Sequence, residues 1–215
     1  MKPAVDWSVY LVTDRPLLGG RSLEAVVEAG VRGGVTVVQL REKDCSTRDY
    51  IDLGWHLKRL LEPFGVPLIV DDRVDVALAI GAAGVHVGQS DMPYHEARRL
   101  LGPDALVGLT VDTFDDAFEA AGWDADYLGI SPVFPTPTKT GTGPAWGLEG
   151  VARLRRASQH VLVGIGGINA GNAGEVIRAG ADGVAVVSAV CAAADPREAA
   201  HRLAAAVAEA KRGRT

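Results

Sequence analysis

A short apolar segment that ends in polar residues recurs eight times along the chain, and this repeat limits the possible folds more than any other feature. The segments are rich in Val, Ile and Leu, and most are continuous rather than alternating. Such runs are typical of parallel strands that are buried on both faces. The predicted strands cover residues 9–14, 35–42, 67–72, 84–89, 105–110, 127–131, 161–167 and 183–188.

Segments with helical spacing separate these strands. Within residues 21–34 the apolar positions fall on one stripe, and Ser22 stands where a helix N-cap is expected. The last helix is predicted to begin at Pro196, directly after Asp195. Several strands are preceded by a small residue and a glycine, and we expect these glycines to cap helices in the left-handed conformation. They are Gly30, Gly84, Gly122 and Gly180.

Eight strand–helix units without an intervening linker predict an α/β protein with one closed (β/α)8 TIM barrel, a single domain over residues 1–215. The basic tail, residues 211–215, is expected to be disordered. A doubly wound open sheet is the alternative fold. That fold normally carries a G-x-G-x-x-G turn after its first strand, and the sequence VTDRPLLGG at this position has none.

The composition excludes several classes of function. The net charge is −5 and the basic residues cluster only in the tail, which argues against a nucleic-acid partner. The chain lacks an apolar run of membrane-spanning length, and its N-terminus lacks the apolar centre of a signal peptide. Cys45 and Cys191 belong to no CxxC pair, so we expect free thiols in a reducing cytoplasm. Small phosphorylated ligands remain compatible with this charge, because their binding needs only a few local cations.

Polar residues gather at the predicted strand ends, where the active sites of such barrels lie. The second strand ends in QLREK, and a period of two places Gln39, Arg41 and Lys43 on the same side. Two cations that project together repel each other unless an anion lies between them. We therefore favour an anion site here over the alternative, a solvated pair of charges.

Carboxylates follow the next two strands. The sequence DDR ends the third strand with Asp71 and Asp72, and HVGQSD places Asp91 just beyond the fourth. Asp72 and Asp91 would suit Mg²⁺, which proteins usually hold through one or two carboxylates together with substrate phosphates. The alternative is that each aspartate caps the helix that follows it. His86 lies within the fourth strand and is expected to pack rather than to react.

The last two strands end in GIGGIN and VVS. Turns at these two places frequently form a phosphate site in this fold, because glycine lets a phosphate approach the backbone N–H groups. The alternative is that Gly166 and Gly167 only make a tight turn. On the residues alone, the barrel mouth is predicted to hold an anion at strands 2 to 4 and a phosphate at strands 7 and 8.

A proline-rich segment follows the sixth strand. Residues 131–147, SPVFPTPTKTGTGPAWG, contain four prolines, four threonines and one charged residue, Lys139. Proline excludes both a helix and a central strand here. A long structureless segment in a small domain is usually a lid, a binding loop or a linker.

Six of these motifs together resemble the thiamine-phosphate synthase family: VVQLREK, DDR, HVGQSD, SPVFPTPTKT, GIGGI and VAVVS. They occur in the family's order over essentially the whole chain. The resemblance implies a (β/α)8 barrel and a transferase that joins the diphosphate of hydroxymethylpyrimidine to hydroxyethylthiazole phosphate or its carboxylated precursor. The products are thiamine phosphate and pyrophosphate, and the cofactor is Mg²⁺. The implied partners are these phosphorylated small molecules, and the resemblance is also compatible with a homo-oligomer.

The resemblance also implies which residues form the site. For the pyrimidine diphosphate they are Gln39, Leu40, Arg41, Glu42, Lys43, Asp71, Thr110 and Lys139. For the thiazole phosphate they are Thr136, Pro137, Thr138, Gly167, Val187 and Ser188. Arg41, Lys43 and Lys139 are the expected catalytic residues, and Asp72 and Asp91 are the expected Mg²⁺ ligands.

The chain departs from the family pattern at three positions. The family usually has Asn where this chain has Asp71, and an ionised carboxylate only accepts hydrogen bonds. The usual Ser-x-His after the fifth strand is Thr110 and Asp112 here. The alternatives are a related barrel that tautomerises a thiazole, and a non-catalytic binder of thiamine precursors. Retention of Arg41, Lys43 and the predicted metal aspartates argues against the first.

Overall fold

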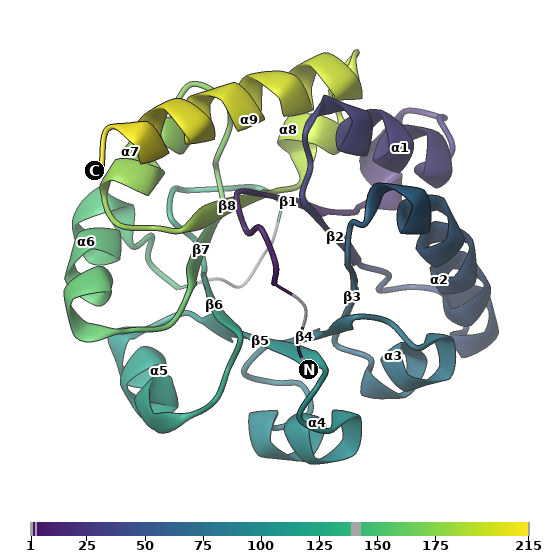
Figure 1. Ribbon diagram of the computed structural model, residues 1–215, viewed down its shortest axis with the longest axis horizontal. Helices are drawn as coiled ribbons and strands as arrows, with labels where there is room; N and C mark the ends of the chain where they lie inside the picture. Colours follow the sequence, from purple (N-terminus) through teal and green to yellow (C-terminus); the bar gives the residue numbers. More distant parts are fainter. Residues whose placement is uncertain (1, 3, 139–142, 215) are drawn as a thin grey trace.

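The computed structural model describes residues 2, 4–138 and 143–214, and it confirms the predicted fold class. Eight parallel strands close into a barrel in chain order, so that β1 pairs with both β2 and β8. Figure 1 looks down this barrel, with the helices outside the strands. The strands are β1 (Val9–Val12), β2 (Val37–Leu40), β3 (Leu68–Asp71), β4 (Gly84–Val87), β5 (Leu106–Val111), β6 (Tyr127–Ile130), β7 (Leu162–Ile165) and β8 (Gly183–Val186).

The helices form a ring around the barrel. They are α1 (Leu23–Gly33), α2 (Thr47–Leu61), α3 (Val74–Ile80), α4 (Tyr94–Leu101), α5 (Phe114–Glu119), α6 (Gly147–Ala157), α7 (Ala173–Arg178), α8 (Ser188–Cys191) and α9 (Pro196–Arg212). Short 3-10 turns lie at η1 (Arg15–Leu18), η2 (Glu62–Phe64) and η3 (Ala120–Gly122). Helix α9 lies across α1 and α7, and it thereby covers the place where β8 meets β1 (Figure 1).

The strands are buried on both faces, which explains their continuous apolar sequences. Outward-facing residues such as Leu11 and Leu128 pack beneath the helices in the main core. Inward-facing residues such as Tyr10, Ile69 and Tyr127 form a second cluster inside the barrel. An eight-stranded barrel has an interior just wide enough for side chains to fill. The inner cluster fills the barrel interior below the carboxyl ends of the strands.

The helix starts agree with the sequence, but the glycine caps do not all agree. Ser22 accepts a hydrogen bond from the backbone N–H of Ala25, as an N-cap does. Gly180 has the expected positive φ, whereas the cap of α1 is Gly34 rather than Gly30. Gly30 lies inside α1, where it packs against apolar side chains.

Gly84 and Gly122 were also expected to be left-handed caps, and that prediction is wrong for both. Gly81 ends α3 with φ of 57°, while Gly84 is the first residue of β4. Gly122 lies in η3 without a positive φ. A glycine before a strand is therefore ambiguous in sequence, since close packing also selects glycine.

The basic tail differs from the expectation of disorder over residues 211–214. Lys211 belongs to α9, and its ammonium group donates a hydrogen bond to Ser8 Oγ at 2.7 Å. Arg214 donates to the carbonyl oxygen of Ala181 at 2.6 Å. These contacts with the barrel order the tail, and local composition gives no sign of them.

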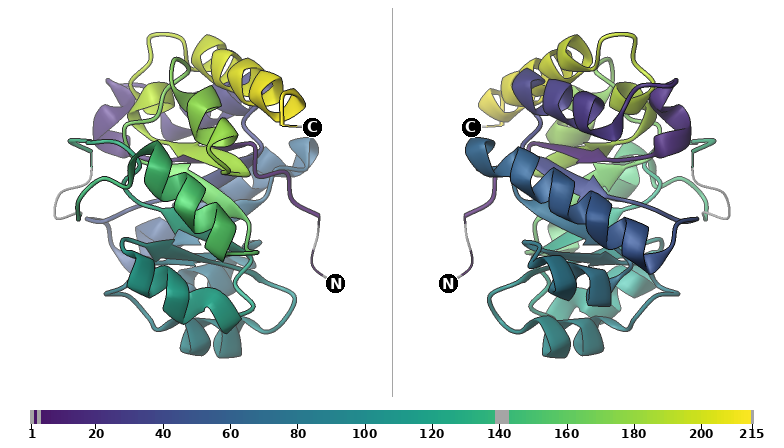
Figure 2. Two further views of the ribbon diagram at one scale, coloured as in Figure 1. Left: turned by 90° about the vertical axis from the view of Figure 1, so that its left-hand side faces the viewer. Right: turned by 90° about the vertical axis from the view of Figure 1, so that its right-hand side faces the viewer.

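Figure 2 shows the N-terminal segment leaving the barrel at one end.

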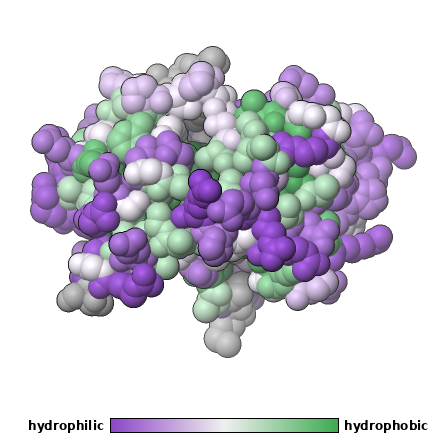
Figure 3. All heavy atoms as spheres, turned by 90° about the horizontal axis from the view of Figure 1, so that it is seen from above, coloured by the Kyte–Doolittle hydropathy of each residue, from purple (hydrophilic) through white to green (hydrophobic). Residues whose placement is uncertain are grey.

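The surface over α9 mixes residue types. Figure 3, which views the molecule from the side of α9 and α1, shows hydrophilic side chains interspersed with apolar ones. In the described part of the chain, no helix combines the length and the apolar character needed to cross a bilayer.

Close packing at Gly84 gives a test of the barrel. A Cβ atom there would overlap the backbone carbonyl of Leu106 on the neighbouring strand. We expect Gly84→Ala to lower the free energy of unfolding by about 2 kcal/mol in urea denaturation, because overpacking forces the backbone to shift. Gly122→Ala is the matched control, since a Cβ at Gly122 meets no heavy atom within 4 Å. Equal stability of the two variants would contradict this packing argument.

Candidate active site

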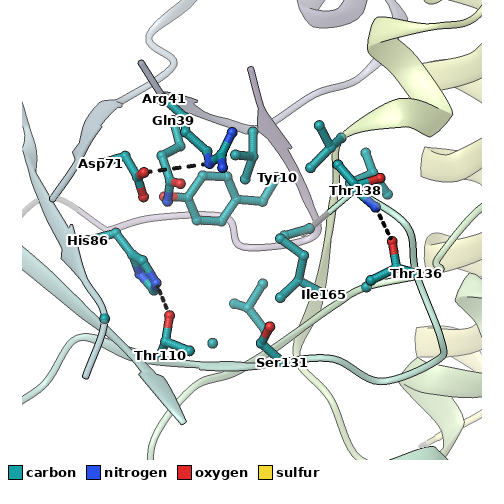
Figure 4. A pocket seen from close by; sticks show the side chains of 18 of the residues that line it. Tyr10, Gln39, Arg41, Asp71, His86, Thr110, Ser131, Thr136, Thr138 and Ile165 are labelled. Carbon is teal, nitrogen blue, oxygen red and sulfur yellow. Dashed lines mark hydrogen bonds and ion pairs between the residues drawn. The ribbon is translucent and has the colours of Figure 1, made fainter. Parts of the chain in front are cut away.

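A cavity of about 750 Å³ opens at the carboxyl ends of the strands. Figure 4 shows side chains from opposite sides of the barrel converging on it. Most of the residues predicted to form the site line this one cavity: Gln39, Arg41, Lys43, Asp71, Asp72, Asp91, Thr110, Thr136, Pro137, Thr138, Gly167, Val187 and Ser188. Residues that are far apart in sequence are thus brought together by barrel closure.

Two of the predicted residues are placed differently. The side chain of Leu40 is fully buried in the core between strands and helices. Glu42 accepts hydrogen bonds from Arg15 at 2.8 Å instead of lining the cavity. The side chains of these two residues lie outside the cavity, because neighbouring residues of an extended strand point to opposite faces, and diphosphate binding by their backbone groups stays a prediction. Lys139 lies outside the described residues.

Arg41 and Lys43 project together, as the alternation predicts, and carboxylates surround them. The Arg41 guanidinium lies 3.3 Å from Asp14 Oδ2 and 3.8 Å from Asp71 Oδ2. Lys43 Nζ lies 3.1 Å from Asp71 Oδ2 and also contacts Asp72 Oδ2. The two cations are therefore held by carboxylates on the cavity wall, where a phosphate group would compete for them.

Asp71 faces the cations rather than turning away from the cavity. Burial raises the pKa of its carboxyl group, although Lys43 and Arg41 act to lower it. Burial also acts to lower the pKa of Lys43, but Asp71 and Asp72 outweigh this effect and raise that pKa. The ammonium group thus stays charged, while the surroundings of Asp71 disfavour its negative charge.

Asp72 and Asp91 do not cap the helices that follow them. The N-cap of α3 is Arg73 and that of α4 is Pro93, and neither cap involves an aspartate side chain. Asp91 instead accepts a hydrogen bond from the backbone N–H of Gly88 at 2.9 Å. Asp72 has φ of 61°, a left-handed conformation that is uncommon outside glycine and tends to occur at functional sites.

The two aspartates form a small anionic pair suited to a hard cation. Burial and the adjacent carboxyl group of Asp72 raise the pKa of Asp91, while the Gly88 N–H lowers it. The Lys43 ammonium contacts Asp72, so a positive charge already lies at this point. Across residues 2, 4–138 and 143–214, no group of three or more His, Cys, Asp or Glu residues could hold a metal. A metal here would need further oxygen ligands from a substrate, as is usual for Mg²⁺.

The opposite wall is formed by the ends of β7 and β8. Gly166 and Gly167 both have positive φ, and a Cβ atom on them would lie 2.6 Å from Pro132 Cβ and 2.8 Å from Phe134 Cβ, respectively. Packing against the proline-rich segment therefore requires both glycines. Gly167 and Ser188 both line the cavity.

The first part of the proline-rich segment is fixed to the rim of the barrel. Val133 N–H donates to the carbonyl oxygen of Ile165 at 2.7 Å, so the chain continues alongside the end of β7. Trp146 N–H donates to the carbonyl oxygen of Pro132 at 2.9 Å, which closes the base of the loop. Between these anchors, Thr138 N–H donates to Thr136 Oγ1 at 3.2 Å, and both threonines face the cavity (Figure 4).

Comparison with known proteins agrees with this geometry. A sequence model of the family described as thiamine monophosphate synthase matches residues 9–190. The chain belongs to this family. It is 59% identical over 195 residues to thiamine-phosphate synthase of Albidiferax ferrireducens, covering 91% of this chain and 89% of that protein. With the Chloroflexus aurantiacus thiamine-phosphate synthase the identity is 52% over 203 residues, and 94% of each chain is covered.

A solved structure supports the same assignment. The thiamine phosphate pyrophosphorylase from Pyrococcus furiosus matches with a TM-score of 0.87 and 38% identity, over 95% of this chain and 97% of that one. The resemblance seen in the six motifs is confirmed, and with it the predicted transferase of thiamine biosynthesis.

For a member of this family, the cavity floor holds residues that the sequence reasoning missed as site residues. Tyr10, His86 and Tyr127 line the cavity together with Gln39 and Thr110. His86 had been assigned a packing role, yet its Nε2 lies 2.7 Å from Thr110 Oγ1 (Figure 4). The sequence signal that could have identified them is period-two alternation, which places all five residues on the inner face of their strands.

The two departures at the end of β5 also lie at the cavity. Thr110 keeps the hydroxyl group of the family's usual serine and uses it in the contact with His86. Asp112, which replaces the usual histidine, lines the cavity as well, and its backbone N–H donates to Asp116 Oδ2 at 2.9 Å.

Competition between Asp71 and an incoming phosphate gives a second prediction. A carboxylate ~4 Å from a phosphate charge costs roughly 4 kcal/mol at an effective dielectric near 20. Because Arg41 and Lys43 screen part of this repulsion, we expect Asp71→Asn to bind inorganic pyrophosphate about tenfold more tightly by calorimetry. Asp115→Asn makes the same change in net charge at an exposed position on α5. If the two variants bind pyrophosphate equally well, Asp71 does not compete with the ligand.

Proposed function

We propose that this protein joins 4-amino-2-methyl-5-(diphosphooxymethyl)pyrimidine to hydroxyethylthiazole phosphate, or to its carboxylated form. The products are thiamine phosphate and pyrophosphate. The observation that carries this proposal is one cavity with two unlike walls. Arg41 and Lys43 lie among carboxylates on one wall, and Gly167 and Ser188 lie on the other. Two phosphorylated substrates can therefore meet over a shared floor.

The residue types fit a dissociative substitution. The thiazole nitrogen attacks with its own lone pair, so the reaction needs no general base to remove a proton. The difficult step is cleavage of the pyrimidine CH₂–O bond, in which the electron pair leaves with the pyrophosphate oxygen. The electron-rich aminopyrimidine stabilises the resulting methylene cation. Arg41 and Lys43 stabilise the negative charge that develops on pyrophosphate, and such preorganised charge is usually the largest catalytic contribution.

Asp72 and Asp91 fit Mg²⁺, because they form an anionic pair that lacks a third protein ligand among the described residues. When bound, the metal would neutralise charge on the diphosphate. Lys43 contacts Asp72 in the free protein. We infer that Lys43 moves from this carboxylate to the diphosphate when substrate and metal bind. Lys139 stays a predicted diphosphate ligand from the proline-rich segment.

The other substrate is assigned to the opposite wall. Thr136, Pro137 and Thr138 line the cavity close to the ends of β7 and β8. Their hydroxyl and backbone groups, with Gly167, Val187 and Ser188, are the proposed ligands of the thiazole phosphate. Gln39 and Thr110, on the floor, are the proposed ligands of the pyrimidine ring. A tautomerase would not need the cation cluster at Arg41 and Lys43. Turnover separates the synthase from a non-catalytic binder, which would also need cations to hold a diphosphate. A reducing cytoplasm and a homo-oligomeric state stay predictions.

Release of pyrophosphate tests the proposed function. We expect the purified protein to release pyrophosphate only when both substrates and Mg²⁺ are present. Omission of each component in turn is the control. Release from the pyrimidine diphosphate alone would indicate a hydrolase. Binding of thiazole phosphate without any turnover would support the precursor binder instead.

The metal assignment gives a separate prediction. Asn at position 91 would still accept the hydrogen bond from Gly88, so Asp91→Asn should keep the local fold while removing one charge. We expect the Mg²⁺ concentration for half-maximal activity to rise at least about tenfold, because carboxylates are the preferred ligands. Asp115→Asn again serves as the charge-matched control. An unchanged Mg²⁺ requirement would remove Asp91 from the metal site.

A further inference from the structure

A chain of hydrogen bonds crosses the floor of the cavity from β2 to β5. Gln39 Nε2 donates to the Tyr10 hydroxyl at 3.0 Å, and the hydroxyls of Tyr10 and Tyr127 lie 2.8 Å apart. Tyr127 Oη lies 2.9 Å from His86 Nδ1, and His86 Nε2 lies 2.7 Å from Thr110 Oγ1. Five side chains from five strands are thus linked in one line beneath the cavity.

Neighbouring glycines make room for this chain. A Cβ atom on Gly108 would overlap the Tyr127 ring, and one on Gly129 would lie 3.1 Å from His86 Cε1. Tyr127 also packs against Trp7, with 4.5 Å between ring centroids, and stacks on His86. These contacts hold both rings from several sides. The geometry of the chain is therefore built into the barrel interior.

The amide of Gln39 sets the direction of the hydrogen bonds. Burial raises the pKa of Tyr10 and Tyr127 well above the ordinary value, so both hydroxyls keep their proton. Within the described chain, the hydrogen bonds of the Tyr10 hydroxyl join it to Gln39 and Tyr127. Since Tyr10 accepts from Gln39, its own hydrogen is satisfied only if it donates to Tyr127. A buried donor left unsatisfied would cost about 1–3 kcal/mol.

The same reasoning continues to the far end of the chain. Tyr127, having accepted from Tyr10, donates to His86 Nδ1. Neutral His86 then carries its proton on Nε2 and donates to Thr110 Oγ1. The hydrogen of the Thr110 hydroxyl is not used in this bond. Thr110 lines the cavity, so it is able to donate that hydrogen to a ligand there.

We propose that Tyr10, Tyr127 and His86 are positioning residues that make Thr110 a hydrogen-bond donor toward the substrate and fix the orientation of the Gln39 amide. With Nε2 of Gln39 committed to Tyr10, its carbonyl oxygen is the acceptor that remains. An aminopyrimidine offers the complementary groups, an amino group that donates and ring nitrogens that accept. This inference rests on the proposed function for the identity of the ligand, but the direction of the chain does not depend on it.

The test replaces Tyr127 with Phe, which keeps the ring and removes the hydroxyl. In the wild-type protein we expect ¹⁵N NMR of labelled histidine to show His86 protonated at Nε2 and unprotonated at Nδ1. In Tyr127→Phe we expect a mixture of the two tautomers. We also expect kcat/KM for the pyrimidine diphosphate to fall at least about tenfold, while KM for the thiazole phosphate stays unchanged.

Tyr94→Phe is the matched control. Its hydroxyl donates to Asp124 at 2.6 Å on the outside of the barrel, so the variant loses a comparable hydrogen bond away from the cavity. We expect it to alter neither the tautomer nor the kinetics. If Tyr127→Phe fails to fold, Tyr10→Phe interrupts the same chain one bond earlier and should give the same mixture of tautomers.

Several results would overturn the proposal. One is a wild-type His86 that carries its proton on Nδ1, because the hydrogen bonds would then run in the opposite direction. Another is an unchanged tautomer in both tyrosine variants, and a third is a KM for the thiazole phosphate that rises as much as kcat/KM for the pyrimidine diphosphate falls. If the wild-type protein forms no thiamine phosphate, the proposed function fails, and the NMR measurement still decides the direction of the chain.

Discussion

Closure of eight parallel strands into one barrel is the constraint on which the rest of this structure depends. Because the strands are parallel, all of their carboxyl ends meet at one rim, and residues from these ends line the same cavity. The pairing of β1 with β8 completes the ring and brings the first and last strands together, with α9 packed outside. A residue near the N-terminus, such as Tyr10, thereby contacts Tyr127 across the barrel.

The site also depends on a balance between its cations and the carboxylates around them. Arg41 and Lys43 are needed for an anionic substrate, yet two uncompensated cations on a cavity wall would repel each other. The carboxylates of Asp14, Asp71 and Asp72 balance them in the free protein. Under the proposed function, substrate binding exchanges these partners for diphosphate. Under that function, Asp71 competes with the diphosphate for Arg41 and Lys43, and an asparagine amide in its place would weaken this competition.

Much of the fold was predictable because it follows from patterns that are local in sequence. Every predicted apolar segment contains a strand, and Ser22 and Asp195 cap their helices as expected. Gly84 was misassigned because glycine serves both turns and close packing, and only the neighbouring strand shows which applies. The tail was misassigned because its order comes from contacts with the barrel, such as the one between Lys211 and Ser8.

The sequence by itself determined the barrel, the family and many of the residues that line the cavity, because strand ends and motifs can be read in chain order. It did not separate the side chains of Leu40 and Glu42 from those of Arg41 and Lys43 within one motif, since strand alternation sends them to opposite faces. Only the tertiary structure showed that His86 and its two tyrosine neighbours form a continuous hydrogen-bonded floor. The physical reason is that each of these bonds joins different strands, and the distance between strands is set by closure of the barrel rather than by any local pattern.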